Sequence, residues 1–435
     1  MDVIVYPGKL RGTVKAPPSK SIAHRALICA ALAEGQSVIH GISASKDMDA
    51  TLRCIQALGA LVERDGENVR IEGIGGSLSA GETPTEKSGT TPVLDCGESG
   101  STFRFLLPVT AATGRPAEFT GSGRLPERPV TELVDEMKKH GISFIPEGRE
   151  TLPFSIEGKL TAGTYSLPGN VSSQYFSGLL FALPLLEGDS EILIEGELQS
   201  SDYIGLTLDM IRQFGISVKQ TETGYEVKGG QHYRASEVRV EGDYSNAAFW
   251  LVAGATGSDL AVQGLEKYSR QGDSVILEIL EGMGALVTWT DDTVRVSGYG
   301  LENTMVDCGE IPDIVPILAV AACTSEDPSG FINAGRLRLK ESDRLSATAS
   351  MLAKLGADIQ ICGDKMDLSV PDGLYGENVI DGCNDHRIVM SAAIAALRCQ
   401  EPVKITGAEA VAKSYPEFFD VFRELGGRAD VISDR

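Results

Sequence analysis

Residues 273–298, DSVILEILEGMGALVTWTDDTVRVSG, decide the fold. In the first half, apolar residues recur every three or four positions up to Gly284, which predicts an amphipathic helix with a left-handed C-cap. In the second half, apolar and polar residues alternate on both sides of Asp291 and Asp292, which predicts a β-hairpin. The same helix, glycine, strand, turn and strand recur along the chain, so the stretch is one copy of a repeat.

Five further copies share this pattern, and their glycines recur about every 70 residues. A second, more apolar helix is predicted between copies, as at residues 99–114, so each unit has the order βαβαββ. The sixth copy ends without a closing strand, which residues 3–18 can supply; both chain ends then belong to one domain. The five copies span residues 47–73, 129–158, 202–230, 343–370 and 416–433.

Six long units favour closed domains over a solenoid, whose units are usually 20 to 50 residues long. We therefore expect two pseudo-symmetric α/β domains of three units each. Residues 1–18 plus 239–435 are expected to form the terminal domain, and residues 19–238 the inserted domain. With only two chain crossings, a hinge and a substrate cleft between the domains are expected.

The composition limits the possible partners. With 61 acidic and 39 basic residues the formal net charge is −22, which argues against nucleic acid or an anionic membrane surface. No apolar run is long enough to span a bilayer and the first residues do not resemble a secretion signal, so we expect a cytoplasmic protein. The eight cysteines form no metal-binding or disulfide pattern and are expected to be reduced.

Against this acidic background, basic residues gather where helices are predicted to begin. Lys20, Ser21 and Arg25 lie in PPSKSIAHR, and the positive end of a helix dipole already favours an anion there. We expect the partner of Lys20 to be a substrate rather than another side chain. The other predicted turns and helix starts hold further basic residues, together with small, hydroxyl, amide and acidic residues beside them. These residues are Gly100, Arg104, Arg124, Arg128, Ser172, Ser173, Gln174, Arg336, Arg338, Lys340, Glu341, Arg344, Asp385, His386, Arg387 and Lys413.

The motifs SKSIAHRAL, GESGSTFR, GRLPERP, SSQ, LKESDRL, DHR and AKSYPEFF occur in this order across almost the whole chain. In this combination the chain resembles the 5-enolpyruvylshikimate-3-phosphate synthase family. The resemblance implies the enolpyruvyl transferase fold, an inverse α/β barrel in two domains built from six βαβαββ repeats. It also implies transfer of the enolpyruvyl group of phosphoenolpyruvate to the 5-hydroxyl of shikimate 3-phosphate, with no metal or organic cofactor.

The resemblance assigns roles to residues that match the family motifs. Two positions depart from its commonest pattern, because Glu98 and Arg336 stand where asparagine is usual. The acid/base set is Lys20, Asp313 and Glu341. Shikimate 3-phosphate would contact Lys20, Ser21, Arg25, Ser172, Ser173, Gln174, Ser200, Tyr203, Asp313, Arg336 and Lys340. Phosphoenolpyruvate would contact Lys20, Gly100, Arg104, Arg124, Gln174, Arg344, His386, Arg387 and Lys413.

Two alternatives stay open from the sequence. A UDP-N-acetylglucosamine enolpyruvyl transferase shares the fold and donor but carries a cysteine in the loop that here reads GSGRLPERP, without cysteine. A non-catalytic anion-binding module would have lost an acid/base residue, whereas Lys20, Asp313 and Glu341 are present. The resemblance further implies inhibition by glyphosate at the loop that holds Gly100, and we expect a monomer.

Overall fold

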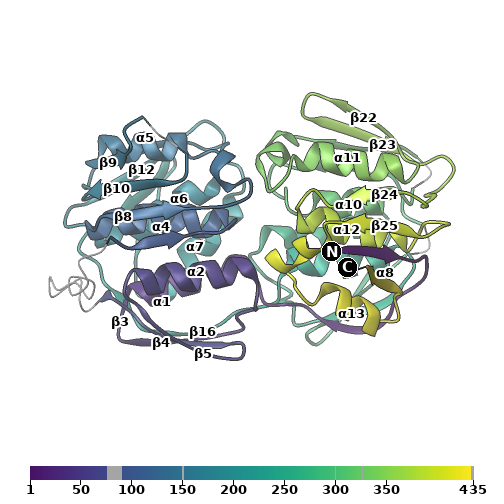
Figure 1. The fold of residues 1–435 in the computed structure, drawn as a ribbon, viewed down its shortest axis with the longest axis horizontal. Helices are drawn as coiled ribbons and strands as arrows, with labels where there is room; N and C mark the ends of the chain where they lie inside the picture. Colours follow the sequence, from purple (N-terminus) through teal and green to yellow (C-terminus); the bar gives the residue numbers. More distant parts are fainter. Residues whose placement is uncertain (76–90, 149–150, 299, 326, 433–435) are drawn as a thin grey trace. The chain divides into compact units, whose positions relative to one another are not determined.

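A computed structural model describes residues 1–75, 91–148, 151–298, 300–325 and 327–432 (Figure 1). The chain forms two compact units, the first from Met1–Pro17 with Glu241–Arg435 and the second from Pro18–Val240. The second unit is therefore an insertion that two connections join to the first. Residues 149 and 150 of the second repeat copy and residue 433 of the sixth lie outside the described residues.

The second unit contains three four-stranded sheets with one shared topology. Each has one parallel pair followed by two antiparallel pairs, as where β7 pairs with β8 and β10 pairs with β8 and β9. The first repeat comprises β16 (Glu237–Arg239), α1 (Lys20–Leu32), β4 (Gln36–His40), α2 (Lys46–Ala57), β5 (Leu61–Asp65) and β6 (Asn68–Glu72). The second comprises β7 (Val93–Asp95), α4 (Gly100–Thr113), β8 (Ala117–Thr120), α5 (Thr131–Lys139), β9 (Ile142–Ile145) and β10 (Phe154–Gly158). The third comprises β11 (Thr164–Pro168), α6 (Ser173–Ala182), β12 (Ser190–Glu195), α7 (Ser201–Gln213), β13 (Val218–Gln220) and β14 (Gly224–Val227).

The first unit repeats this topology in three more four-stranded sheets. The fourth repeat comprises β2 (Arg11–Lys15), α8 (Tyr244–Ala255), β17 (Asp259–Gln263), α9 (Ile276–Gly282), β18 (Leu286–Thr290) and β19 (Thr293–Ser297). The fifth comprises β20 (Met305–Asp307), α10 (Val315–Ala322), β21 (Ser329–Ile332), α11 (Arg344–Lys354), β22 (Asp358–Cys362) and β23 (Lys365–Ser369). The sixth comprises β24 (Val379–Asp381), α12 (His386–Ala396), β25 (Val403–Thr406), α13 (Phe418–Glu424), β26 (Ala429–Ile432) and β1 (Asp2–Val5). The predicted βαβαββ repeat is thereby confirmed.

The N-terminal segment supplies two strands rather than the single closing strand expected. β1 pairs antiparallel with β25 and β26 and completes the sixth sheet, so both chain ends lie in the same unit (Figure 1). β2 pairs in parallel with β17 and starts the fourth sheet just before the chain enters the second unit. β16, at the end of that unit, pairs in the same way with β4.

The glycine that ends each repeated helix follows the last helical residue by two positions. Gly59, Gly141, Gly215, Gly284, Gly356 and Gly426 all have positive φ, between 87° and 108°. This left-handed conformation costs a residue with a Cβ, and it turns the chain from the helix into the hairpin. The sequence pattern therefore predicts both the helix end and the start of the hairpin.

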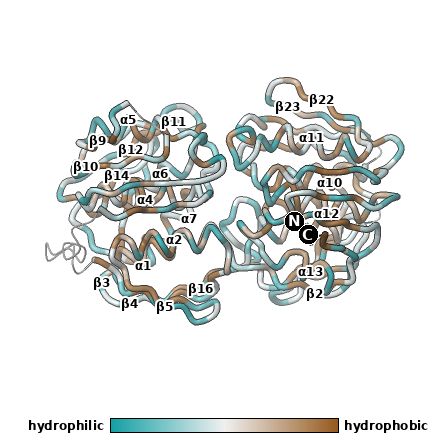
Figure 2. Tube along the Cα trace, viewed as in Figure 1, coloured by the Kyte–Doolittle hydropathy of each residue, from teal (hydrophilic) through white to brown (hydrophobic). Residues whose placement is uncertain are grey.

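The more apolar helix of each repeat forms the core of its unit. All residues of α8, α10 and α12 are buried, and α10 (VPILAVAA) is a hydrophobic segment of the chain in Figure 2. In the second unit α4 and α6 pack closely, since a Cβ at Gly178 would lie 2.3 Å from the carbonyl oxygen of Arg104. This packing fixes the N-termini of both helices, where Gly100, Arg104, Ser172, Ser173 and Gln174 lie.

The eight cysteines are all free thiols, and six of them are buried. Among the helices that the structure describes, none combines the length and the apolarity needed to cross a bilayer.

Candidate active site

Lys20 is the first residue of α1. Its Nζ lies 2.9 Å from Oδ2 of Asp47, in the first turn of α2, and both side chains are largely buried. The expectation that no side chain pairs with Lys20 is therefore wrong. Sequence analysis missed Asp47. The available signal was Ser45 two residues before it, which caps α2 and so places Asp47 in the first turn of that helix.

Arg25 lies one turn further along α1 and is 2% exposed. Its three nitrogens donate to Oγ1 of Thr207 at 2.8 Å and to the carbonyls of Ser21 and Tyr203 at 2.6 and 2.7 Å. Burial lowers the pKa of Arg25 to about 10. The guanidinium thus ties α1 to the start of α7, where Ser200 has a left-handed φ of 58°.

The N-termini of α4 and α6 are joined by Gln174. Its Oε1 accepts from Nη1 of Arg104 at 2.8 Å, and its Nε2 donates to Oγ of Ser101 at 2.9 Å. Ser172 caps α6 by accepting from the backbone N–H of Gln174, and Ser173 begins that helix. Arg104 also donates to the carbonyl of Pro129. Arg104, Ser172 and Gln174 are therefore linked by hydrogen bonds at the starts of α4 and α6, and Ser173 is the next residue after Ser172.

The structure places Gly100 directly against two guanidinium groups. A Cβ built on Gly100 would lie 2.7 Å from Nη1 of Arg128 and 3.0 Å from Nη1 of Arg104. Arg124 is more open, since its side chain is 40% exposed and its Nε lies 3.5 Å from Glu127. Glu98, which departs from the family pattern, lies against Gly123, where a Cβ would meet its carboxylate.

A buried chain of hydroxyl groups leads from α1 to the start of α4, and sequence analysis missed it. Nδ1 of His24 lies 2.7 Å from Oγ1 of Thr51, which lies 2.7 Å from Oγ1 of Thr102. Thr102 then donates to the capping hydroxyl of Ser99 at 2.7 Å. Burial, together with Lys20 nearby, holds the pKa of His24 well below its usual range, so this histidine is neutral.

In the first unit, Arg344 begins α11 and is bound by three carboxylates. Nε donates to Asp385 at 2.8 Å, Nη1 to Asp313 at 2.6 Å and Nη2 to Glu341 at 2.7 Å. Asp385 is fully buried and also accepts from Oγ of Ser342. The acid/base residues Asp313 and Glu341 and the anion-binding candidate Arg344 therefore form one cluster.

Lys340 completes this cluster, with Nζ 3.3 Å from Oδ1 of Asp313. Burial lowers the pKa of Lys340 to about 8, although Asp313 opposes this change. Burial alone would raise the pKa of Asp313, but Lys340, Arg344 and Arg387 outweigh it and hold that pKa well below its usual range. Arg336, the other departure from the family pattern, donates to the carbonyl of Gly309 at 3.3 Å.

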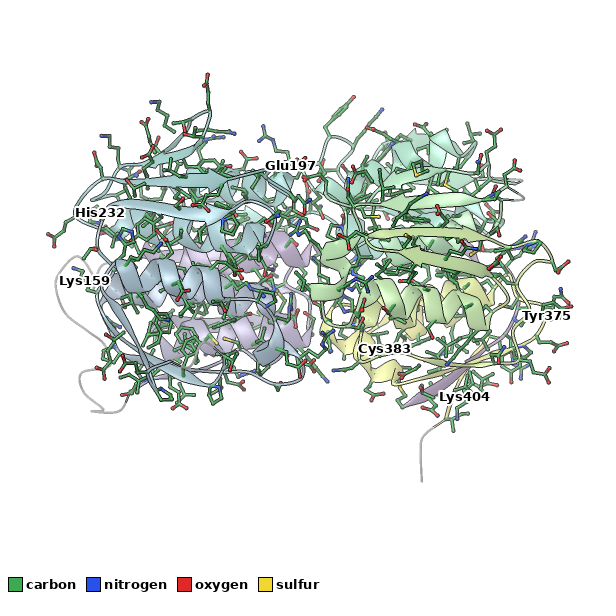
Figure 3. The ribbon with its side chains drawn as sticks, turned by 90° about the horizontal axis from the view of Figure 1, so that it is seen from above. Lys159, Glu197, His232, Tyr375, Cys383 and Lys404 are labelled. Atoms are coloured by element: carbon green, nitrogen blue, oxygen red, sulfur yellow. The ribbon has the colours of Figure 1, made fainter. Side chains whose placement is uncertain are left out.

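Arg387, in the first turn of α12, differs from Arg344. It is 3% exposed, and Nη1 donates to the carbonyl of Ser245 at 2.7 Å. Among the described residues, no carboxylate oxygen lies within 4.0 Å of it. His386, beside it, is buried, and the turn before α12 carries Cys383, labelled in Figure 3, and Asn384, whose carbonyl accepts from Lys413. A buried cation of this kind is suited to an anionic ligand.

Each unit thus gathers its own share of the predicted residues. The second unit holds the residues around α1, α4, α6 and α7: Lys20, Ser21, Arg25, Gly100, Arg104, Arg124, Ser172, Ser173, Gln174, Ser200 and Tyr203. The first unit holds those before or in α10, α11, α12 and α13: Asp313, Arg336, Lys340, Glu341, Arg344, His386, Arg387 and Lys413.

Comparisons with known proteins agree with the motifs. A 3-phosphoshikimate 1-carboxyvinyltransferase of Clostridium perfringens is 43% identical over 427 residues, covering 98% of each chain. The enzyme of that name from Clostridioides difficile is 41% identical, with the same coverage. Among solved structures, an EPSP synthase of Acinetobacter baumannii matches with a TM-score of 0.81 and 26% identity, covering 99% of this chain and 100% of that one.

The enolpyruvyl transferase NikO of Streptomyces tendae has a TM-score of 0.78 at 17% identity, covering 99% of this chain and 98% of its own, and so shares the fold. The comparisons do not favour the UDP-N-acetylglucosamine enolpyruvyl transferase alternative. The model of the family described as EPSP synthase (3-phosphoshikimate 1-carboxyvinyltransferase) matches residues 4–422, and the chain belongs to this family.

Proposed function

We propose that this protein transfers the enolpyruvyl group of phosphoenolpyruvate to the 5-hydroxyl of shikimate 3-phosphate and releases phosphate. The observation that carries the proposal is the 43% identity with a 3-phosphoshikimate 1-carboxyvinyltransferase along 98% of the chain. The polar groups support it, because two multiply charged substrates need several buried cations and hydroxyl groups. Residues of both units take part in this one reaction.

Shikimate 3-phosphate is assigned to hydroxyl and basic groups of the second unit, together with three residues of the first. Arg25 mainly positions Ser21 and Tyr203, because its N–H groups already donate to the backbone carbonyls of these two residues. The full set is Lys20, Ser21, Arg25, Ser172, Ser173, Gln174, Ser200, Tyr203, Asp313, Arg336 and Lys340.

Phosphoenolpyruvate is assigned to the guanidinium groups, whose planar forks match carboxylate and phosphate. Arg387 is the strongest candidate, because no carboxylate oxygen of the described residues lies within 4.0 Å of it. Arg344 already donates to Asp313 and Glu341, so a substrate anion that binds it competes with these two carboxylates. The full set is Lys20, Gly100, Arg104, Arg124, Gln174, Arg344, His386, Arg387 and Lys413.

The chemistry needs two proton movements. The 5-hydroxyl gives its proton to Asp313 as its oxygen bonds to C2 of phosphoenolpyruvate, while Glu341 or Lys20 protonates C3. The resulting tetrahedral adduct then gives the C3 proton back to the residue that supplied it, and the C–O bond to phosphate breaks. The phosphate leaves with the proton that Asp313 had accepted. Lys340, then Arg344 and Arg387, hold the pKa of Asp313 low. If Arg344 turns from Asp313 to the substrate, the pKa of Asp313 rises and it becomes a stronger base.

Three finer points belong to the same proposal. Glyphosate competes with phosphoenolpyruvate at the Gly100 loop, the protein acts as a monomer, and it works in the cytoplasm. The eight free thiols support a reducing compartment. Size-exclusion chromatography with light scattering tests the monomer, which a dimer mass would contradict.

The deciding experiment measures phosphate released from phosphoenolpyruvate with shikimate 3-phosphate or UDP-N-acetylglucosamine as the acceptor. We expect release only with the first. An ¹⁸O label in the bridging oxygen of phosphoenolpyruvate should leave with phosphate, because the C–O bond breaks. Release with the nucleotide sugar, or label kept on the organic product, would refute the proposal.

A further inference from the structure

Asp273 is a buried carboxylate outside the residues that the mechanism uses. It lies in the 3-10 turn Gly272–Val275 that precedes α9, and it is 1% exposed. Its Oδ2 accepts a hydrogen bond from Oγ of Ser245, whereas its Oδ1 has no hydrogen-bond partner among the described residues. A buried carboxylate with an unused oxygen is unfavourable when charged, which favours adding a proton.

Ser245 connects this carboxylate to Arg387. Its hydroxyl donates to Asp273, and its backbone carbonyl accepts from Nη1 of Arg387 at 2.7 Å. Nε of Arg387 has no hydrogen-bond partner within the described part of the chain. One residue near the start of α8 therefore fixes the carboxylate on one side and the guanidinium on the other.

The charges that face Asp273 come from three neighbouring elements. Arg387 at the start of α12 attracts a negative charge on Asp273, while Asp313 before α10 and Asp243, the cap of α8, repel it. Burial first, and then Asp313, raise the pKa of Asp273 to about 7. An anion bound to Arg387 cancels the one cationic attraction in this set, so it shifts Asp273 further toward its protonated form.

We infer that Asp273 takes up a proton when an anionic group of the substrate binds at Arg387, and that it positions this guanidinium through Ser245. The inference rests on the proposed function, in which Arg387 binds phosphoenolpyruvate. The proton comes from water or buffer and adds to the carboxylate, and it returns to solvent when the anion leaves. Asp273 is a positioning residue, because it acts on the substrate through Arg387.

Proton uptake can be measured by calorimetry with sulfate as the probe, since this dianion does not itself titrate near pH 7. Titrations at pH 7 in buffers of different ionisation enthalpy give the number of protons bound per sulfate. For a group with a pKa of about 7 we expect uptake of up to about 0.5 proton by the wild type. Asp273→Asn should bring the uptake close to zero.

Two further variants separate this role from a general loss of structure. The Ser245 hydroxyl lowers the pKa of Asp273, so Ser245→Ala should keep the uptake but move its midpoint to higher pH. Glu278→Gln, an exposed carboxylate of α9, is the matched control and should behave as the wild type. Tryptophan fluorescence verifies that each variant is folded.

Equal proton uptake by the wild type and Asp273→Asn would overturn the inference, as would a wild type that binds no sulfate. Failure of the proposed function is distinguished by the phosphate-release assay. If the wild type forms enolpyruvylshikimate 3-phosphate but Asp273→Asn leaves the uptake unchanged, only the role of Asp273 is wrong.

Discussion

Replacing Asp385 by asparagine tests how strongly the carboxylate cluster holds Arg344 in the first unit. Asp385 is fully buried and accepts from Nε and Nη2 of Arg344 at 2.8 and 3.3 Å. Asparagine keeps the size of the side chain but removes the charge, and its amide N–H₂ can face the donors of Arg344. Removing one partner of a buried ion pair costs about 3 to 5 kcal/mol.

Because Asp313 and Glu341 still bind Arg344 in this variant, we expect the free energy of unfolding to fall by an amount near the lower end of this range, about 3 kcal/mol. The matched variant Ser342→Ala removes one hydrogen bond to the same carboxylate but keeps its charge, which costs about 1.5 to 3 kcal/mol. With a urea dependence of about 2 to 3 kcal/mol/M, the unfolding midpoint of Asp385→Asn should fall by about 1 M or more.

The chain offers a probe that reports on this unit alone. It contains two tryptophans, Trp250 and Trp289, and both belong to the first unit. Trp250 is fully buried and stacks on Phe418 with ring centroids 5.0 Å apart, so unfolding changes its emission. Urea unfolding followed by tryptophan fluorescence therefore measures the first unit. A midpoint for Asp385→Asn no lower than that of Ser342→Ala would refute the argument that the charge of Asp385 stabilises this cluster.

Three further predictions address the other groups. Asp47→Asn should lower kcat/KM about tenfold, because it frees the Lys20 ammonium from its fixed position; an unchanged kcat/KM contradicts this role. Gly100→Ala should raise the inhibition constant of glyphosate, because the added Cβ displaces Arg128; equal inhibition of both proteins contradicts it. For Asp273, a folded-state pKa of about 7 lies above the usual 3.8, so the folded state binds more protons and its stability falls as pH rises from about 4 to 7. Between pH 5 and pH 8, Asp273→Asn should therefore gain about 3 kcal/mol of stability relative to the wild type, on top of a constant loss from the hydrogen bond to Ser245. A difference in urea midpoint that stays constant over this pH range contradicts the prediction.

The fold was largely predictable because its signals are local. Gly284 and its five counterparts end a helix at the same offset, and hairpin alternation follows each of them. The pairing of β2 with β17 and of β16 with β4 was not predictable, because in each pair the two strands come from distant parts of the chain. The residues of a short strand do not indicate which strand it pairs with when the partner lies far away in the sequence.

The candidate residues were predictable by type and position, but their partners were not. Lys20 at a helix start indicated an anion site, yet the pair with Asp47 depends on how α1 packs beside α2. In the same way, LKESDRL indicated several charges close together in sequence, whereas Asp313 and Asp385 reach Arg344 from other elements. Local sequence thus gives the chemistry available at a site, and tertiary packing decides which charges are already neutralised.

Arg344 and Arg387 show what this neutralisation means for binding. Both guanidinium groups are nearly fully buried, but Arg344 has three carboxylate partners and Arg387 has none within 4.0 Å among the described residues. Asp273 and Asp313 act on Arg387 at longer range, but no described carboxylate is in direct contact with this buried cation. An anion arriving at Arg387 displaces no carboxylate in direct contact, whereas one arriving at Arg344 competes with Asp313 and Glu341, which the proposed function uses as acid and base. In the proposed function, a substrate that takes Arg344 away from Asp313 thereby makes Asp313 a stronger base, which links substrate binding to the reaction.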